Sequence, residues 1–371
     1  MTDLCSHAHA VARTATKHQP VRPPEEALVT LVSGRLRRSA CVAAAHFMAL
    51  APVVAQLPTA RIVTAANTFI ATLDQTQRTN VQFAFDNEQQ RARWSNFPVQ
   101  MSRRAGLSLR DLNAAQRSAA MALVATALSK RGYQKVLEIM EGDEVLKEHE
   151  RNNPLFGKDL YFISLLGTPS ASAPWMLQFG GHHLALNVTI IGERGVLTPS
   201  LTAAQPALYT RDGKTVRPLG QENDKAFTLL AALDAVQRSK AVLNYQVGDL
   251  VLGPGQDGKT IQPEGLKASA MNAQQRALLL DVISEWTGIV HDAAAAARLA
   301  EIRAALDDTW FAWSGPTTVE PGRNGSSYYR IQGPTLVIEY SPQRMGGDAS
   351  MHVHTIYRDP TNDYGRKPVT K

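Results

Sequence analysis

The chain is poor in cysteine. Its 371 residues include only two, Cys5 and Cys41, and both precede the part of the sequence expected to fold. A cysteine nucleophile, a thiolate metal site and a structural disulfide are therefore excluded from the folded part. Any metal ligands there must be histidine nitrogens or oxygen atoms.

A strong charge of one sign is also lacking. The formal net charge is +6, but residues 1–55 hold 6 Lys/Arg against 3 Asp/Glu, which leaves 33 against 30 for the rest. These charges are spread evenly, and no basic stripe with interleaved aromatic residues is present. The sequence therefore predicts that nucleic acid is not a partner.

The sequence has no apolar run long enough for a comfortable membrane span. The longest, Ala40–Val54, follows the basic residues Arg35, Arg37 and Arg38 and ends in small residues at Ala55. This pattern is typical of a secretory signal peptide, with a buried helix as the alternative. We therefore predict a signal segment at residues 1–55 and a single domain at residues 56–371. The mature protein would be periplasmic or extracellular, without a stable membrane span.

Periodicity places helices and strands in separate blocks. Apolar residues recur at helical spacing in six segments, whereas two β-rich blocks are punctuated by glycine, proline and asparagine. No fixed-period repeat appears. The pattern predicts an α+β fold, an antiparallel sheet with helices packed on one side and both β blocks sharing one core. The expected helices are 57–77, 108–130, 133–147, 222–240, 273–290 and 293–306, and the β blocks are 174–199 and 310–357.

Two pairs of histidines stand out in the β blocks. His182 and His183 lie in "FGGHHLALN", and His352 and His354 lie in "MHVHTIYRDPTNDYG". Alternate residues of a strand face the same way, so the imidazoles of His352 and His354 can converge on one ion. Nitrogen ligands suit zinc, copper or iron better than calcium or magnesium. The alternative is that each histidine is a hydrogen-bonded strand residue.

Charged residues near the second pair are candidates for catalysis. Glu339 lies in the preceding strand and Asp363 follows the pair. Either carboxylate could be a metal ligand, fix an imidazole tautomer or act as general base. Arg358 could bind an anionic substrate. The alternatives are a turn role for Asp363 and ion pairing for Arg358.

Several motifs together resemble a known family. "PWMLQFGGHHLALNVTI", "YYRIQGP", "VIEY" and "HVHTIYRDPTNDYG" occur in this order. They are similar to an exported bacterial and fungal family, the domain of unknown function number thirty-five hundred. The resemblance runs from about Phe69 to Gly365 and implies one domain, but it implies no activity.

Two kinds of function agree with these observations. The first is an exported metal-binding protein, with a metalloenzyme of hydrolytic or oxidative chemistry as the favoured form. Its substrate would be a small or saccharide-like molecule. The second is a metal-free periplasmic ligand-binding or scaffold protein, in which the histidines hydrogen-bond a polar ligand or each other. A metal-free hydrolase is a weaker third possibility, because the sequence has no nucleophile motif.

Overall fold

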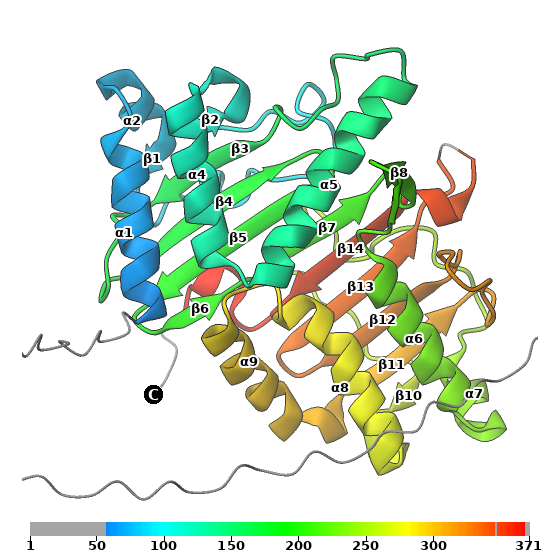
Figure 1. Ribbon diagram of the computed structural model, residues 1–371. Coiled ribbons are helices and arrows are strands. Elements are labelled where there is room, and N and C mark those ends of the chain that lie inside the picture. Colours follow the sequence, from blue (N-terminus) through cyan, green and yellow to red (C-terminus); the bar gives the residue numbers. More distant parts are fainter. Residues whose placement is uncertain (1–56, 346, 368–371) are drawn as a thin grey trace, which may run out of the picture. The chain divides into compact units, whose positions relative to one another are not determined.

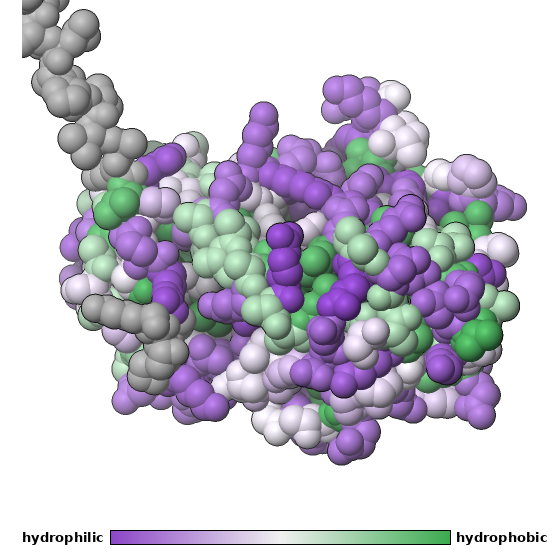
Figure 2. Space-filling model, turned by 90° about the horizontal axis from the view of Figure 1, so that it is seen from below, coloured by the Kyte–Doolittle hydropathy of each residue, from purple (hydrophilic) through white to green (hydrophobic). Residues whose placement is uncertain are grey.

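The computed structural model describes residues 57–345 and 347–367. The described residues belong to one compact unit. The predicted signal segment lies outside the described residues, so the expected cleavage stays a prediction. In the described ranges, no helix has the length and apolar character that crossing a membrane requires. Hydrophilic and hydrophobic residues are intermingled on the face shown in Figure 2.

Helices and strands alternate in blocks, as the periodicity predicts. The helices are α1 (Pro58–Ala71), α2 (Gln75–Val81), α3 (Glu88–Arg91), α4 (Ala114–Ala127), α5 (Lys130–His149), α6 (Gly220–Ala232), α7 (Ala235–Ala241), α8 (Ala273–Thr287) and α9 (Asp292–Ala304). The main strands are β3 (Phe162–Leu166), β4 (Trp175–Gly181), β5 (Leu184–Ile191), β7 (Ser200–Ala204), β11 (Trp310–Ser314), β12 (Tyr328–Gly333), β13 (Leu336–Pro342) and β14 (Val353–Arg358). The short strands are β1 (Gln82–Phe83), β2 (Leu107–Ser108), β6 (Arg194–Val196), β8 (Tyr209–Arg211), β9 (Lys214–Val216) and β10 (Leu266–Lys267).

One large sheet contains strands from both β blocks. Its order is β1-β3-β4-β5-β7-β14-β13-β12-β11-β10, and every pairing along this path except the parallel β1–β3 pair is antiparallel. Helices α1, α4, α5, α6 and α8 lie across one face (Figure 1). The predictions of an α+β fold, a mainly antiparallel sheet and a core shared by the two β blocks are confirmed.

The two faces of the sheet have different coverings. On the helix side of β14, the Thr355 hydroxyl accepts a hydrogen bond from Trp286 Nε1 of α8 at 3.1 Å. The residues on either side of Thr355 point the other way. Ile356 is fully buried on that opposite face, in a small apolar cluster covered by loops rather than by the main helices. The predicted site residues His354 and Arg358 share this loop face.

The two halves of the chain repeat one order of elements. In both halves a pair of helices (α1–α2, α6–α7) is followed by a short strand (β2, β10), a second pair of helices (α4–α5, α8–α9) and four long strands. The first half also contains β1, α3 and β6, and β8 and β9 precede α6. The repeat extends to detail, because Asn113 and Asn272 form the same capping box with Gln116 and Gln275 at the starts of α4 and α8. The first half contributes β3-β4-β5-β7 and the second contributes β14-β13-β12-β11, so the halves meet where β7 pairs with β14.

The same relation appears in the helix layer. Leu128 and Val290, at the helix turns α4–α5 and α8–α9, form an isolated antiparallel bridge. The backbone N–H of Ser129 donates to Ile289 O at 3.0 Å. In the opposite direction, the N–H of His291 donates to Ala127 O at 3.3 Å. The relation between the halves is therefore close to a two-fold rotation.

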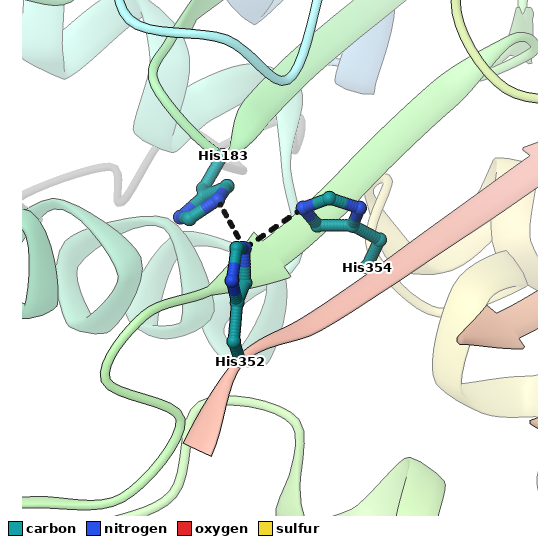
Figure 3. Close-up of side chains that lie close together, drawn as sticks. All are labelled: His183, His352 and His354. Carbon is teal, nitrogen blue, oxygen red and sulfur yellow. Dashed lines mark hydrogen bonds between the residues drawn. The ribbon is translucent and has the colours of Figure 1, made fainter. Parts of the chain in front are cut away.

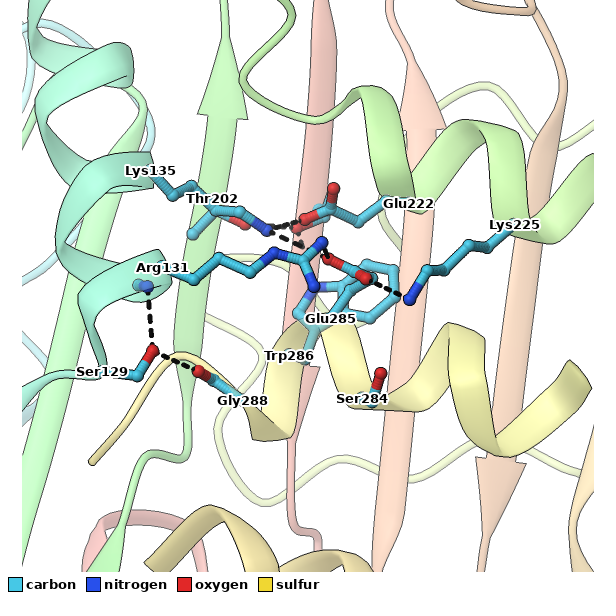
Figure 4. A network of polar contacts seen from close by, with 12 residues as sticks. Ser129, Arg131, Lys135, Thr202, Glu222, Lys225, Ser284, Glu285, Trp286 and Gly288 are labelled. Carbon is cyan, nitrogen blue, oxygen red and sulfur yellow. Dashed lines mark hydrogen bonds and ion pairs between the residues drawn. The ribbon is translucent and has the colours of Figure 1, made fainter. Parts of the chain in front are cut away.

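A buried charge network joins the halves beneath the helices (Figure 4). Lys135 of α5 pairs with Glu222 of α6, and its Nζ lies 4.0 Å from the Glu285 carboxylate of α8. Lys225 contacts the same Glu285 carboxylate at 2.6 Å, and Arg131 also pairs with it. Both glutamates are buried, so each charge depends on its partners.

Candidate metal centre

His183 is placed by a two-residue turn between β4 and β5. Its backbone lies in the left-handed region, with φ of 61°, which is uncommon for a residue other than glycine. Two hydrogen bonds hold this conformation. The His183 N–H donates to Asn96 O at 3.2 Å, and the His183 carbonyl accepts from Ala203 N at 2.8 Å. The turn thereby directs the ring toward the start of β14.

His352 and His354 come from the other half of the chain. His354 lies in β14, and His352 immediately precedes that strand. Two pairings bring the β4–β5 turn to this point. β5 pairs with β7 through Leu184 and Thr202, and β7 pairs with β14 through Ala203 and His354. The antiparallel join between the halves therefore assembles the site.

Nitrogens of the three imidazoles converge (Figure 3). His352 Nε2 lies 3.1 Å from His183 Nε2 and 3.0 Å from His354 Nε2. One nitrogen from each ring fits within a group whose members are no more than 4.8 Å apart. Nitrogens bound to one zinc ion at about 2.0–2.1 Å would be separated by similar distances. The group could therefore hold a metal ion with small adjustments.

The Nδ1 atoms of His352 and His354 face oxygen atoms. His352 Nδ1 lies 3.2 Å from the carbonyl of Met345, and His354 Nδ1 lies 3.4 Å from Asp249 Oδ1. An acceptor at Nδ1 favours a proton on that nitrogen and leaves Nε2 with its lone pair. Both rings thus have the surroundings of a metal-ligating histidine.

Burial favours the neutral form of His183 and of His352. Burial and the neighbouring histidines hold the pKa of His183 well below its ordinary value. Burial, with a further contribution from His354, lowers the pKa of His352 to about 4. A neutral imidazole has a free lone pair, which is the form that binds a metal.

His182 does not belong to this group of three. Its Nδ1 lies 2.6 Å from Asp143 Oδ1 of α5, and its ring stacks on that of His183 with 3.7 Å between centroids. Phe156 contacts the ring as well, with a centroid distance of 5.1 Å. The structure thus places His182 behind His183 rather than beside it, and its predicted role as a ligand stays a prediction.

Glu339 is fully buried, and its hydrogen bonds go to residues other than the histidines. Its carboxylate accepts a hydrogen bond from Tyr328 Oη at 2.6 Å and from the backbone N–H groups of Val251 and Leu252, each at 2.8 Å. Burial raises the pKa of Glu339, although these hydrogen bonds oppose the change. These contacts account for a structural role, and a catalytic role stays a prediction.

Arg358 and Asp363 form a second buried cluster. Arg358 donates to the carbonyls of Leu252 and Gly253 at 2.7 and 3.0 Å. Its guanidinium also pairs with the carboxylates of Asp257 and Asp363, each at 2.8 Å. None of these contacts reaches a histidine. Arg358 therefore contacts the loop that contains Asp257, and Asp363 contacts Arg358 and the backbone N–H of Asp359.

Sequence reasoning did not identify three residues that contact the histidines. Asp143 bonds His182, Asp249 faces His354, and Asn96 Nδ2 lies 3.5 Å from nitrogens of the His354 ring. Asn96 belongs to "WSNFP", where aromatic residues and proline gave a weak signal. Asp143 lies in a helix and Asp249 in an irregular loop, and neither has a local pattern that indicates a site.

Comparison with known proteins gives one match. The family described as "Protein of unknown function (DUF3500)" matches residues 55–366. The chain belongs to this family. No curated protein and no solved structure matches significantly. The match covers all three converging histidines, and the resemblance noted from the sequence is confirmed.

Proposed function

We propose that this member of DUF3500 binds a divalent transition metal ion, zinc, copper or iron, through His183, His352 and His354. The observation that carries the proposal is the convergence of three Nε2 atoms, with two contacts of 3.0 and 3.1 Å. The lowered pKa values of His183 and His352 and the oxygen acceptors at the Nδ1 atoms of His352 and His354 support it. All three donors are imidazoles, which favours these metals over calcium or magnesium.

A metalloenzyme is the favoured form of this function. Three protein ligands leave a coordination position for water or substrate, as in catalytic zinc sites. His352 is only partly buried, whereas the other two histidines are buried, so the centre approaches the surface on the side of His352. Zinc in this position would supply hydroxide for hydrolysis, and copper or iron would supply oxidative chemistry. A small or saccharide-like molecule is the proposed substrate.

The decisive experiment is metal analysis of protein purified without a histidine tag. We expect roughly one ion per chain in the wild type and none in His354→Ala, because three nitrogen ligands are needed for a site of this kind. His149→Ala is the matched control, since this histidine lies at the end of α5 outside the group. Absence of zinc, copper, iron and nickel from the wild type, even after reconstitution, would overturn the proposal.

A metal-free binding protein is the alternative, and the same contacts favour it. Separations of 3.0 and 3.1 Å also fit hydrogen bonds between imidazoles. In that case the rings bind one another or a polar ligand. The metal analysis separates the two functions, because only the first predicts stoichiometric metal that depends on His354.

Export to the periplasm or the outside of the cell is proposed from the sequence of residues 35–55. The basic residues followed by an apolar run support it. N-terminal sequencing of exported protein should find a mature chain that begins near Gln56. A protein that keeps residues 1–55 and stays in the cytoplasm would overturn the proposal.

A further inference from the structure

A long loop brings a carboxylate to the histidine centre. Asp249 lies between α7 and β10, in a stretch without helix or strand. Its Oδ1 lies 3.4 Å from His354 Nδ1 and accepts a hydrogen bond from Gln343 Nε2 at 2.9 Å. The side chain is 61% exposed. Its place therefore depends on what holds the loop.

The loop is held by two buried charged residues from neighbouring strands. Glu339 of β13 accepts hydrogen bonds from the N–H groups of Val251 and Leu252. Arg358 of β14 donates to the carbonyls of Leu252 and Gly253. Donors and acceptors of the loop backbone are thus both satisfied by side chains of the sheet. Such charge-assisted bonds are stronger than bonds between neutral groups.

Further contacts hold the far end of the loop. Asp257 pairs with Arg358 at 2.8 Å and accepts a hydrogen bond from Tyr364 Oη at 3.0 Å. Burying Glu339 and Arg358 is costly unless both are fully bonded. A loop that served only as a connection would not require these buried charges. The observed bonds fix the segment from Val251 to Asp257, and Asp249 lies two residues before it.

We propose that Asp249 is a positioning residue for the metal centre, which rests on the proposed function. Its carboxylate accepts the Nδ1–H hydrogen bond of His354 and fixes the tautomer in which Nε2 faces the ion. A carboxylate in this place also orients the ring and increases the basicity of the ligand nitrogen. Glu339 and Arg358 act on the centre through Asp249, by fixing the loop.

Titration of the purified full-length protein with Co²⁺ tests this assignment. Asp249→Ala is expected to weaken Co²⁺ binding by roughly 10- to 100-fold, the range for loss of such a support. It should also shift the visible Co²⁺ absorption bands, because the His354 ring loses its orientation. Asp249→Asn keeps an acceptor oxygen and should recover most of the affinity. Asp308→Ala, at an exposed carboxylate that pairs with Lys267, is the matched control and should bind as the wild type does.

A double variant tests the contribution of the loop anchor. Glu339→Gln disturbs the bonds to Val251 and Leu252, so it should weaken Co²⁺ binding in the wild-type background and have little effect once Asp249 is alanine. Independent, additive effects would overturn the role of the anchor.

Two results separate this proposal from the proposed function. Folded Asp249→Ala that binds Co²⁺ within about twofold of the wild type, with an unchanged spectrum, overturns the positioning role while the metal centre stands. A wild type that binds neither Co²⁺ nor Zn²⁺ overturns the metal centre itself. Because Asp249 is exposed, we expect its alanine variant to fold, and circular dichroism checks this.

Discussion

His182 and His183 are consecutive in the chain, and their rings are stacked with 3.7 Å between centroids. Only His183 joins the converging group, whereas His182 bonds Asp143. The difference comes from the backbone, because a positive φ at His183 ends the strand alternation and turns its ring into the site. A turn conformation therefore decides which histidine can be a ligand.

The backbone at His183 should tolerate asparagine better than valine. The left-handed conformation costs about 1–2 kcal/mol for most residues, whereas asparagine adopts it readily. We expect His183→Val to have a free energy of unfolding about 1–2 kcal/mol below that of His183→Asn. Urea denaturation of both metal-free variants measures the difference. Equal midpoints with equal slopes would mean that the turn relaxes in the valine variant.

Gly132 of α5 should not accept a side chain. Alanine usually stabilises an exposed helix interior by about 1 kcal/mol relative to glycine. A Cβ at Gly132, however, would lie 2.1 Å from the Ile289 carbonyl oxygen, at the bridge between the two halves. We expect Gly132→Ala to lower the free energy of unfolding by about 1–3 kcal/mol, the usual cost of overpacking.

Gly142, in the same helix, is the matched control for this substitution. A Cβ there would meet the ring of Tyr209 at 3.3 Å, and a side chain can shift where a backbone carbonyl cannot. Gly142→Ala should change the free energy of unfolding by less than about 1 kcal/mol. Chemical denaturation compares the two variants. A Gly132→Ala protein as stable as Gly142→Ala would show that the halves can separate slightly at no cost.

Much of the fold could be predicted from the sequence, because its signals are local. Helical spacing and β-rich blocks identified the fold class, and strand alternation placed His352 and His354 on one face. The structural repeat was not recognised, although "LNAAQR" and "MNAQQR", beginning at Leu112 and Met271, mark equivalent helix starts. Loops of unequal length between the repeated elements remove a fixed period.

The supporting residues of the site could not be predicted in this way. Asp143 and Asp249 come from a helix and a loop far from the histidines in sequence, and only the tertiary pairing of α5 and the loop with the sheet brings them near. Glu339, Arg358 and Asp363 are candidates on the sequence alone because they lie near His354 along the chain. Nearness in sequence does not give a shared partner. Arg358 lies in the same strand as His354, yet it pairs with Asp257, whereas His354 contacts His352.

Lys135 gives a prediction for the buried network. Replacing it by methionine leaves Glu222 buried without its cation, and removal of one partner of a buried pair costs about 3–5 kcal/mol. We expect Lys135→Met to lose roughly that much stability near neutral pH. The double variant Lys135→Met/Glu222→Gln should recover most of it, because the unpaired charge is gone. A single variant as stable as the double variant would show that Lys225 or water compensates for the lost lysine.

The stability that Lys135→Met loses should depend on pH in a defined direction. Burial, and then the nearby Glu285, raise the pKa of Glu222 above its ordinary value, while Lys135 opposes this shift. The folded carboxyl thus keeps its proton to higher pH than the unfolded one. The free energy of unfolding therefore falls as pH rises from the ordinary glutamate value through the folded pKa.

Lys135→Met raises this pKa further, so its stability deficit should be larger near about pH 7 than near about pH 5. Urea unfolding of wild type and variant at both pH values measures it. A deficit that is constant, or larger in acid, would mean that the lysine acts through packing and not through the charge of Glu222.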